Sequence, residues 1–254
     1  KRNWFRMWPK DRKLPEFSYI VQTMDTAFEE EHYDARKQKT DPSACAILGL
    51  FNTKQCFTES EMKRMGVKSK YAALLCDLWV ERFGFPELLE ETRKTYRTLW
   101  GSPGRRPDLV LIENKASGIS LRQTLMKYGV PTVPFNPHQQ SKTMRAHAAS
   151  PLIMQGMLFV PESARPDRRG QPRDWAEPMV EQMCSFAGEG SVEHDDINDC
   201  ICQAMLHLME KGFFHAEPQG RAYPDPDEKD EAERREAMGM AERERTGTGN
   251  PYAA

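Results

Sequence analysis

The chain has 254 residues, a formal net charge of −2, and 39% hydrophobic residues. This length suits one substantial domain or at most two small ones, and no apolar run approaches the roughly 18 residues of a membrane span. The charge excludes a protein that is basic over its whole surface, so any binding of nucleic acid must come from local patches. The six cysteines form no CxxC pair, which favours reduced thiols of a cytosolic protein over a disulfide framework or a zinc site.

The two ends of the chain differ in composition from its middle. Residues 1–17 are basic, aromatic and interrupted by proline, which is typical of a linker from a preceding domain, or of the end of that domain, packed onto this one. The absence of an initial methionine fits an excised fragment. Residues 216–254 hold ten acidic and six basic residues with little apolar content, and predict a disordered charged tail. The predicted folded domain therefore covers residues 18–215.

Three apolar segments follow one another in the first part of this domain. The first is Tyr19–Asp25, the second is Ser43–Phe51, and the third lies near Ala73–Trp79. Their connections favour an antiparallel meander. Residues 52–70, between the second and third segments, are polar, and there Thr58 to Gly66 is typical of a short capped helix.

The later segments alternate between helical and strand patterns. Pro86–Trp100 has helical spacing, Asp108–Glu113 is a short apolar strand, and Ile119–Tyr128 is an amphipathic helix. A strand between two helices is the pattern that generates parallel neighbours. The remaining predicted elements are an edge strand at Thr132–Phe135, a helix within Ser141–Gln155, a strand at Met157–Val160, a helix at Asp174–Ala187 and a helix from His194 to about Lys211. The sequence thus predicts an α/β fold with a mixed sheet, an antiparallel meander plus parallel strands, flanked by helices.

Carboxylates stand at the ends of two predicted strands and at the start of the last helix. Asp25 ends the first strand and Glu113 ends the fourth; if these strands are parallel neighbours, both side chains lie at one edge of the sheet. A third group, Asp195, Asp196 and Asp199, opens the last helix. Like charges in one place require a cation, and oxygen ligands favour Mg²⁺ or Mn²⁺. Two such ions ~3.5–4 Å apart could clamp the oxygens of a phosphoryl displacement. The alternative left open is that each carboxylate only caps a turn or helix.

The apolar stripe of the last helix ranks the three aspartates. At ~100° per residue, Asp196 lies about 110° from the middle of this stripe, on its flank, where it can reach the sheet edge. Asp199 lies about 170° away, on the predicted solvent side. Asp195 is the N-cap and is free to turn back toward a metal. The predicted order of ligands is therefore Asp196, Asp195, Asp199; the stripe consists of Ile197, Ile201, Ala204 and Leu208.

Five motifs in this order resemble the nuclease domain of phage large terminases. They span roughly residues 18–211 and are Asp25, Leu111–Gly118, Lys142–Arg145, Gly156–Phe159 and His194–Asp196. The resemblance implies a ribonuclease H-like fold. It also implies a metal-dependent endonuclease that cuts double-stranded viral DNA concatemers during genome packaging, in the host cell cytoplasm. Asp25, Glu113 and one or both of Asp195 and Asp196 would be the catalytic ligands of two Mg²⁺ or Mn²⁺ ions.

The same resemblance implies partners. Terminases join this nuclease to a packaging ATPase domain and work with a small terminase subunit and a portal protein. The chain contains no GxxxxGK[ST] phosphate loop, so the ATPase half is not part of it. Two rivals stay open: junction resolvase or transposase chemistry on the same fold, and a non-catalytic module that holds DNA or docks onto the motor.

Basic residues near the carboxylate motifs are candidates for contacts with DNA phosphates. Lys142 and Arg145 lie one turn apart on one helix face, and Lys115 follows Glu113 by two residues. For Lys142 and Arg145 the alternative is ion pairing with acidic surface residues, and for Lys115 it is neutralisation of the acidic pocket. The segment 165–173, which includes Arg168 and Arg169, is a candidate patch for the DNA backbone.

Overall fold

The computed structural model describes residues 1–27, 42–136, 140–162, 176–188, 190–191 and 195–214. All of them belong to one compact unit, Lys1–Phe214. Three residues singled out in the sequence, Arg168, Arg169 and His194, lie outside the described residues. No helix in the described part is long and apolar enough to cross a membrane.

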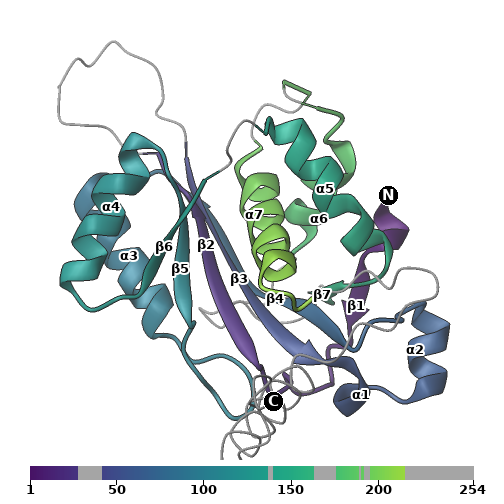
Figure 1. Cartoon of the computed structure of the whole chain (residues 1–254). Helices are drawn as coiled ribbons and strands as arrows, with labels where there is room; N and C mark the ends of the chain where they lie inside the picture. Colours follow the sequence, from purple (N-terminus) through teal and green to yellow (C-terminus); the bar gives the residue numbers. More distant parts are fainter. Residues whose placement is uncertain (28–41, 137–139, 163–175, 189, 192–194, 215–254) are drawn as a thin grey trace, which may run out of the picture. The chain divides into compact units, whose positions relative to one another are not determined.

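A seven-stranded mixed sheet forms the centre of the unit (Figure 1). In the spatial order of the sheet the strands are β1 (Arg6–Trp8), β7 (Leu158–Pro161), β4 (Tyr71–Glu81), β3 (Ser43–Asn52), β2 (Tyr19–Asp25), β5 (Leu109–Glu113) and β6 (Thr132–Phe135). Strands β2, β3 and β4 form an antiparallel meander, and the other neighbouring strands pair in parallel. This confirms the predicted α/β fold class with its mixed sheet, and β6 is the predicted edge strand.

Helices cover both faces of the sheet (Figure 1). One face carries α3 (Phe85–Arg97) and α4 (Ala116–Lys127), and the other carries α5 (Lys142–Met154), α6 (Glu177–Ser185) and α7 (Asp196–Glu210). The short helices α1 (Thr53–Cys56) and α2 (Glu59–Met65) connect β3 to β4, and a 3₁₀ turn, η1, covers Arg2–Trp4. The predicted capping box between Thr58 and Glu61 is present, and Gly66 ends α2 with φ 67°.

Two features of the chain differ from the sequence prediction. Helix α4 begins at Ala116 rather than Ile119, because the Ile119 amide donates to the Lys115 carbonyl and closes a helical turn over residues that looked like a loop. Within the segment predicted as a linker, β1 extends the sheet and Trp8 is 1% exposed. Its ring meets those of Phe51, Phe57 and Phe159 edge-on at 5.2, 5.3 and 6.1 Å.

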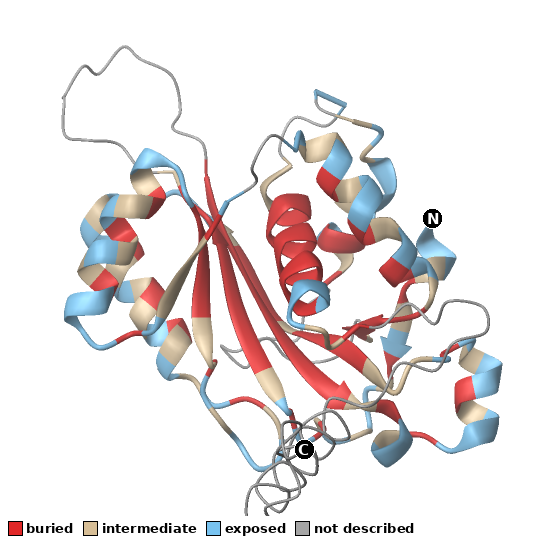
Figure 2. Ribbon diagram, viewed as in Figure 1, coloured by how far each residue is buried: buried red, intermediate tan, exposed pale blue. Residues whose placement is uncertain are grey.

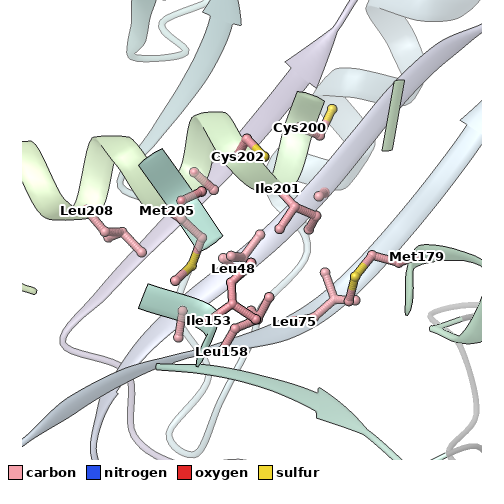
Figure 3. Close-up of a cluster of buried hydrophobic side chains, with 14 of the residues drawn as sticks. Leu48, Leu75, Ile153, Leu158, Met179, Cys200, Ile201, Cys202, Met205 and Leu208 are labelled. Carbon is pink, nitrogen blue, oxygen red and sulfur yellow. The ribbon is translucent and has the colours of Figure 1, made fainter. Parts of the chain in front are cut away.

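Helix α7 is buried almost all round, as Figure 2 shows by its colour. It contacts β2 and β3 on the sheet side, and α5 and α6 pack against it from the other side. Ile201 and Met205 point into the core formed with Leu48, Leu75 and Ile153 (Figure 3). The thiols of Cys200 and Cys202 are also buried. A helix enclosed in this way has no solvent-facing side over most of its length, and this matters for its polar residues.

Candidate metal centre at the ends of strands β2 and β5

The parallel pairing of β2 and β5 brings Asp25 and Glu113 together. Met24 pairs with Ile112, so the carboxylates follow side by side at the carboxyl ends of the two strands. Both side chains are nearly inaccessible, with 6% and 3% of their surface exposed. This confirms that the two residues share one edge of the sheet, where ligands of parallel strands bind.

Lys115 places one ammonium group between these two carboxylates. Its Nζ lies 3.1 Å from Oδ1 of Asp25 and also contacts Oε2 of Glu113. Burial lowers the pKa of Lys115, but its contacts with Asp25 and Glu113 outweigh this and leave the pKa raised. The lysine therefore neutralises the acidic pocket, while 47% of its side chain stays exposed.

The carboxyl group of Asp25 is strongly perturbed by its surroundings. Burial raises its pKa to about 7; Lys115 opposes this rise, and the negative charges of Glu113 and Asp199 add to it. The ionised form of Asp25 is thus costly to keep in the protein without a neighbouring cation. Perturbed groups of this kind cluster at functional sites.

A second charge cluster joins α5 to α7. Nζ of Lys142 lies 2.6 Å from Oδ1 of Asp195 and 2.9 Å from Oδ2 of Asp199. The Arg145 guanidinium lies 2.8 Å from Oδ1 of Asp199 and 3.6 Å from Oε1 of Glu113. Only 4% of the Arg145 side chain is exposed. Lys142 and Arg145 therefore form ion pairs with acidic residues, which is the alternative to contacts with DNA phosphates. These pairs lie largely inside the protein and not on its surface. Arg145 also links the two clusters, because it reaches both Asp199 and Glu113.

The predicted orientation of Asp199 was wrong. Its side chain is 0% exposed, whereas Asp196 is partly exposed and the Asp195 side chain is 17% exposed. The predicted solvent side of α7 is covered by α5, which supplies Lys142 and Arg145 as partners. One signal in the sequence matches this arrangement. Lys142 and Arg145 are three residues apart and Asp195 and Asp199 are four residues apart, and each spacing is about one helical turn, so two facing helices can align the two pairs.

The start of α4 supports the end of β5 by close packing. A Cβ atom on Gly118 would lie 2.1 Å from the carbonyl oxygen of Glu113 and 3.0 Å from Cγ2 of Ile112, so only glycine fits there. Next to it, Oγ of Ser117 donates to the carbonyl of Thr26 at 2.8 Å. These contacts fix the backbone that follows Asp25 relative to the backbone that carries Glu113.

Helix α7 is tied to the same strand through backbone and thiol groups. The amide of Asp25 donates to Sγ of Cys200 at 3.2 Å, and Oγ1 of Thr23 donates to the Cys200 carbonyl at 3.1 Å. The pKa of the Cys200 thiol is raised well above its usual value by burial. Cys200 therefore acts as a neutral packing group that holds α7 against β2.

The donor set suits a hard divalent cation. Within the described ranges no three carboxylate, histidine or cysteine side chains converge into a ready-made metal site. Asp25 and Glu113 nevertheless already share one cation, the Lys115 ammonium. Among these residues Oε2 of Glu113 and Oδ2 of Asp199 are buried without a hydrogen bond, although each meets an ammonium group. Oxygen atoms of this kind are the ligands that Mg²⁺ and Mn²⁺ prefer, so the residues fit such an ion.

The chain is similar to several solved structures of terminase nucleases. The large terminase nuclease from thermophilic phage G20c with bound zinc has 13% sequence identity and a TM-score of 0.46, over 80% of this chain and 94% of that one. The human cytomegalovirus terminase nuclease domain has 11% identity and a TM-score of 0.44, over 75% and 82%. The large terminase nuclease domain of Thermus phage P74-26 has 12% identity and a TM-score of 0.43, over 80% and 90%. No family model and no curated protein matches the chain.

Proposed function

We propose that this domain is a metal-dependent endonuclease with a ribonuclease H-like fold, the nuclease half of a viral large terminase. The observation that carries the proposal is the buried pair Asp25–Glu113, which shares a single cation at the ends of two parallel strands. The order of the five sequence motifs supports the assignment to terminases. The substrate would be concatemeric double-stranded viral DNA, cut during genome packaging in the cytoplasm of the host cell.

The residues of the two clusters take different parts in this function. Asp25 and Glu113 would hold Mg²⁺ or Mn²⁺, and the sequence adds Asp196 and Asp195 as further ligands. When bound, a divalent ion supplies a Lewis acid for the scissile phosphate and activates the attacking water; the sequence predicts two such ions. Asp199 is a further candidate ligand, because it is buried and its negative charge raises the pKa of Asp25.

The basic residues proposed to contact DNA differ in how accessible they are. Lys115 is the best placed of those in the described residues, because its side chain is about half exposed and its ammonium lies at the carboxylate pair. Lys142 is 26% exposed, and Arg145 is too buried to meet a phosphate without rearrangement. Arg168 and Arg169 stay predictions from sequence. The ATPase domain, the small terminase subunit and the portal protein are the partners that the proposal implies.

A plasmid-nicking assay tests the function. The domain should convert supercoiled plasmid to nicked and linear forms with Mn²⁺, should be inactive with chelator, and should lose activity as Asp25→Asn or Glu113→Gln. Glu87→Gln, an exposed carboxylate of α3, is the matched control and should cleave normally. DNA binding without nicking under any metal would identify a holding or docking module. A strong preference for four-way junctions over linear duplex would identify a resolvase.

DNA binding provides a second measurement. Contacts from lysine and arginine to phosphates are independent of sequence, and each releases counterions, so the affinity should fall steeply with salt. Binding to several unrelated 30-mer duplexes should give similar dissociation constants. Tight binding to one duplex alone, persisting at high salt, would contradict this proposal.

A further inference from the structure

The polar segment 52–70 folds into a small unit, the α1–α2 module, at one end of the sheet. Its two helices lie beyond the end of β3 and the start of β4 (Figure 1). Thr53 joins the two ends of the module, because its amide donates to the Lys70 carbonyl at 2.8 Å and its hydroxyl donates to the Ser69 carbonyl at 2.7 Å. Strand β3 starts beside Asp25 and ends at the module, so the module lies roughly 25 Å from the carboxylate pair.

The α1–α2 module contains a cavity of about 580 Å³. Its apolar wall consists of Phe57, Met62 and Val67, and these side chains are 6%, 8% and 4% exposed. Pockets that bind ligands measure about 300–1,000 Å³ and have mainly apolar walls with a few polar groups. The cavity therefore has the size and the apolar lining of a binding pocket.

The apolar wall is held in place by contacts within the protein. The ring of Phe57 stacks on that of Phe159 with the centroids 5.4 Å apart, and the Arg12 guanidinium lies over the other ring position at 4.5 Å from the Phe57 centroid. The amide of Val67 donates to the Met62 carbonyl at 2.9 Å. A wall that is already fixed loses little conformational freedom when a ligand binds, which favours affinity.

The charged side chains around the cavity are mainly cationic. Lys54, Lys63 and Lys68 line it from α1, from α2 and from the return to β4, and all three are exposed. Of the described residues that line the cavity, Glu59 alone is acidic. None of the three lysines forms an ion pair with another residue in the described part of the chain. The cavity therefore offers positive charge to an anionic partner.

The polar groups of the cavity suit separate carboxylates better than a phosphate. Phosphate sites use several backbone amides that point at one anion. Here the amides of Phe57, Gly66 and Val67 already donate to carbonyls of the module. The three lysines also stand on three separate segments, so carboxylates spaced along a chain match them better than one compact anion. The phosphate backbone of DNA, in addition, has no large apolar group that would fill the apolar wall.

We propose that the α1–α2 module is a docking site for an acidic peptide segment of another protein. A large apolar side chain of this segment packs against the apolar wall, and its carboxylates lie beside the three lysines. The buried apolar contact supplies most of the affinity, whereas the charges set the orientation and speed the association. This inference does not rest on the proposed nuclease function, because the module and the carboxylate pair lie at opposite ends of β3.

A short synthetic peptide tests the docking site. The probe carries fluorescein and has a central leucine–phenylalanine pair between glutamates. Fluorescence anisotropy with the whole chain should show saturable binding that weakens with salt. The double variant Lys54→Glu with Lys68→Glu should bind at least about tenfold more weakly, because attraction turns into repulsion. Arg97→Glu with Lys127→Glu makes the same change in net charge at exposed positions of α3 and α4, and this control should bind as the wild type does.

Two further measurements separate specific docking from general attraction between charges. A peptide with two glycines in place of the leucine–phenylalanine pair should bind at least about tenfold more weakly, because it cannot fill the apolar wall. In methyl NMR of the methionine-labelled chain, the probe should shift the signal of Met62. It should leave those of Met126 and Met144 unchanged, since they are exposed on α4 and α5. Both measurements still decide if the double variant fails to fold.

Several results would overturn the docking site. They are the absence of saturable binding up to about 1 mM peptide, equal binding of the glycine peptide, equal weakening by the two double variants, or an unchanged Met62 signal. A dimer in sedimentation that Lys54→Glu with Lys68→Glu dissociates would assign the module to a second copy of the chain instead. Short duplex DNA that displaces the probe and shifts Met62 would assign it to nucleic acid.

Discussion

The guanidinium of Arg145 on α5 lies 2.8 Å from the carboxylate of Asp199 on α7, and both side chains are buried. The same guanidinium nitrogen lies 3.6 Å from Glu113 at the end of β5. One arginine therefore connects two helices to the strand that carries a candidate metal ligand. The packing of α5 on α7 and the shape of the metal centre depend on each other through this residue.

Arg145→Met should be strongly destabilising. Removing one partner of a buried ion pair leaves the other charge without compensation, which costs about 3–5 kcal/mol. The double variant Arg145→Met with Asp199→Asn should recover much of this loss, because no charge is left unpaired. Urea unfolding followed by circular dichroism measures the stability of both variants. The control is Lys94→Met on α3, which removes an exposed lysine from its pair with Glu91 and should change stability by under about 1 kcal/mol. Equal losses for Arg145→Met and Lys94→Met would show that Arg145 is not a structural cation.

Asp25→Asn should not destabilise the metal-free domain. Its raised pKa means that folding favours the protonated carboxyl, so the ionised form at pH 8 reduces the free energy of unfolding. The stabilisation that the protonated carboxyl gives the folded state is fully present below about pH 4 and is lost as the pH rises through about 7. At pH 8 with chelator the neutral amide should leave stability unchanged or raise it by about 1 kcal/mol, while cleavage is lost. A loss of several kcal/mol would assign Asp25 a structural role.

The sequence predicted the part of the site that depends on local pattern. Asp25 and Glu113 each end a short apolar segment, and the helix on either side of Asp108–Glu113 predicts the parallel pairing that brings them together. Gly66 and the capping box of Thr58 were equally visible, because each belongs to a few neighbouring residues. Such features need no knowledge of how distant elements pack.

The features that the sequence did not predict depend on packing between distant elements. The face of α7 that carries Asp199 looked like a solvent face because the apolar stripe lies opposite, and only the position of α5 explains its burial. The role of Trp8 likewise depends on rings from β3 and β7, more than 40 residues away in the chain. Helical phase identifies the most apolar side of a helix, but it does not reveal a second layer above it.

Gly118→Ala should impair the metal centre without touching a charged group. The added methyl group would meet the Glu113 carbonyl oxygen at 2.1 Å, so either α4 or the end of β5 must shift. We expect Mn²⁺ affinity and nicking activity to fall at least about tenfold, because small displacements of ligands are costly. Ser120→Ala, on the exposed side of the same helix, is the control and should behave as the wild type. A normal Mn²⁺ affinity for Gly118→Ala would show that this contact does not position Glu113.

His207 should make the domain less stable in acid. It lies on α7, 4% exposed and 3.1 Å from the Tyr19 hydroxyl, and burial followed by the nearby charge of Lys211 lowers its pKa to about 4. An unfolded histidine titrates near 6.5, so the unfolded chain binds more protons in this window. The stabilisation is complete above about pH 6.5 and is lost as the pH falls toward 4. Between pH 7.5 and 5 the free energy of unfolding of the wild type should therefore fall by about 1–2 kcal/mol more than that of His207→Gln, allowing for screening by solvent.

Urea unfolding at the two pH values measures this difference, and comparison with a variant removes the contribution of the other titrating groups. His147→Gln, which changes an exposed histidine of α5, is the matched control and should keep the wild-type loss. In addition, the imidazole signals of His207 in a proton NMR titration should stay those of the neutral ring down to about pH 5. An equal pH dependence in the wild type and in His207→Gln would mean that the imidazole is protonated in the folded protein, and that its contact with Tyr19 does not require the neutral form.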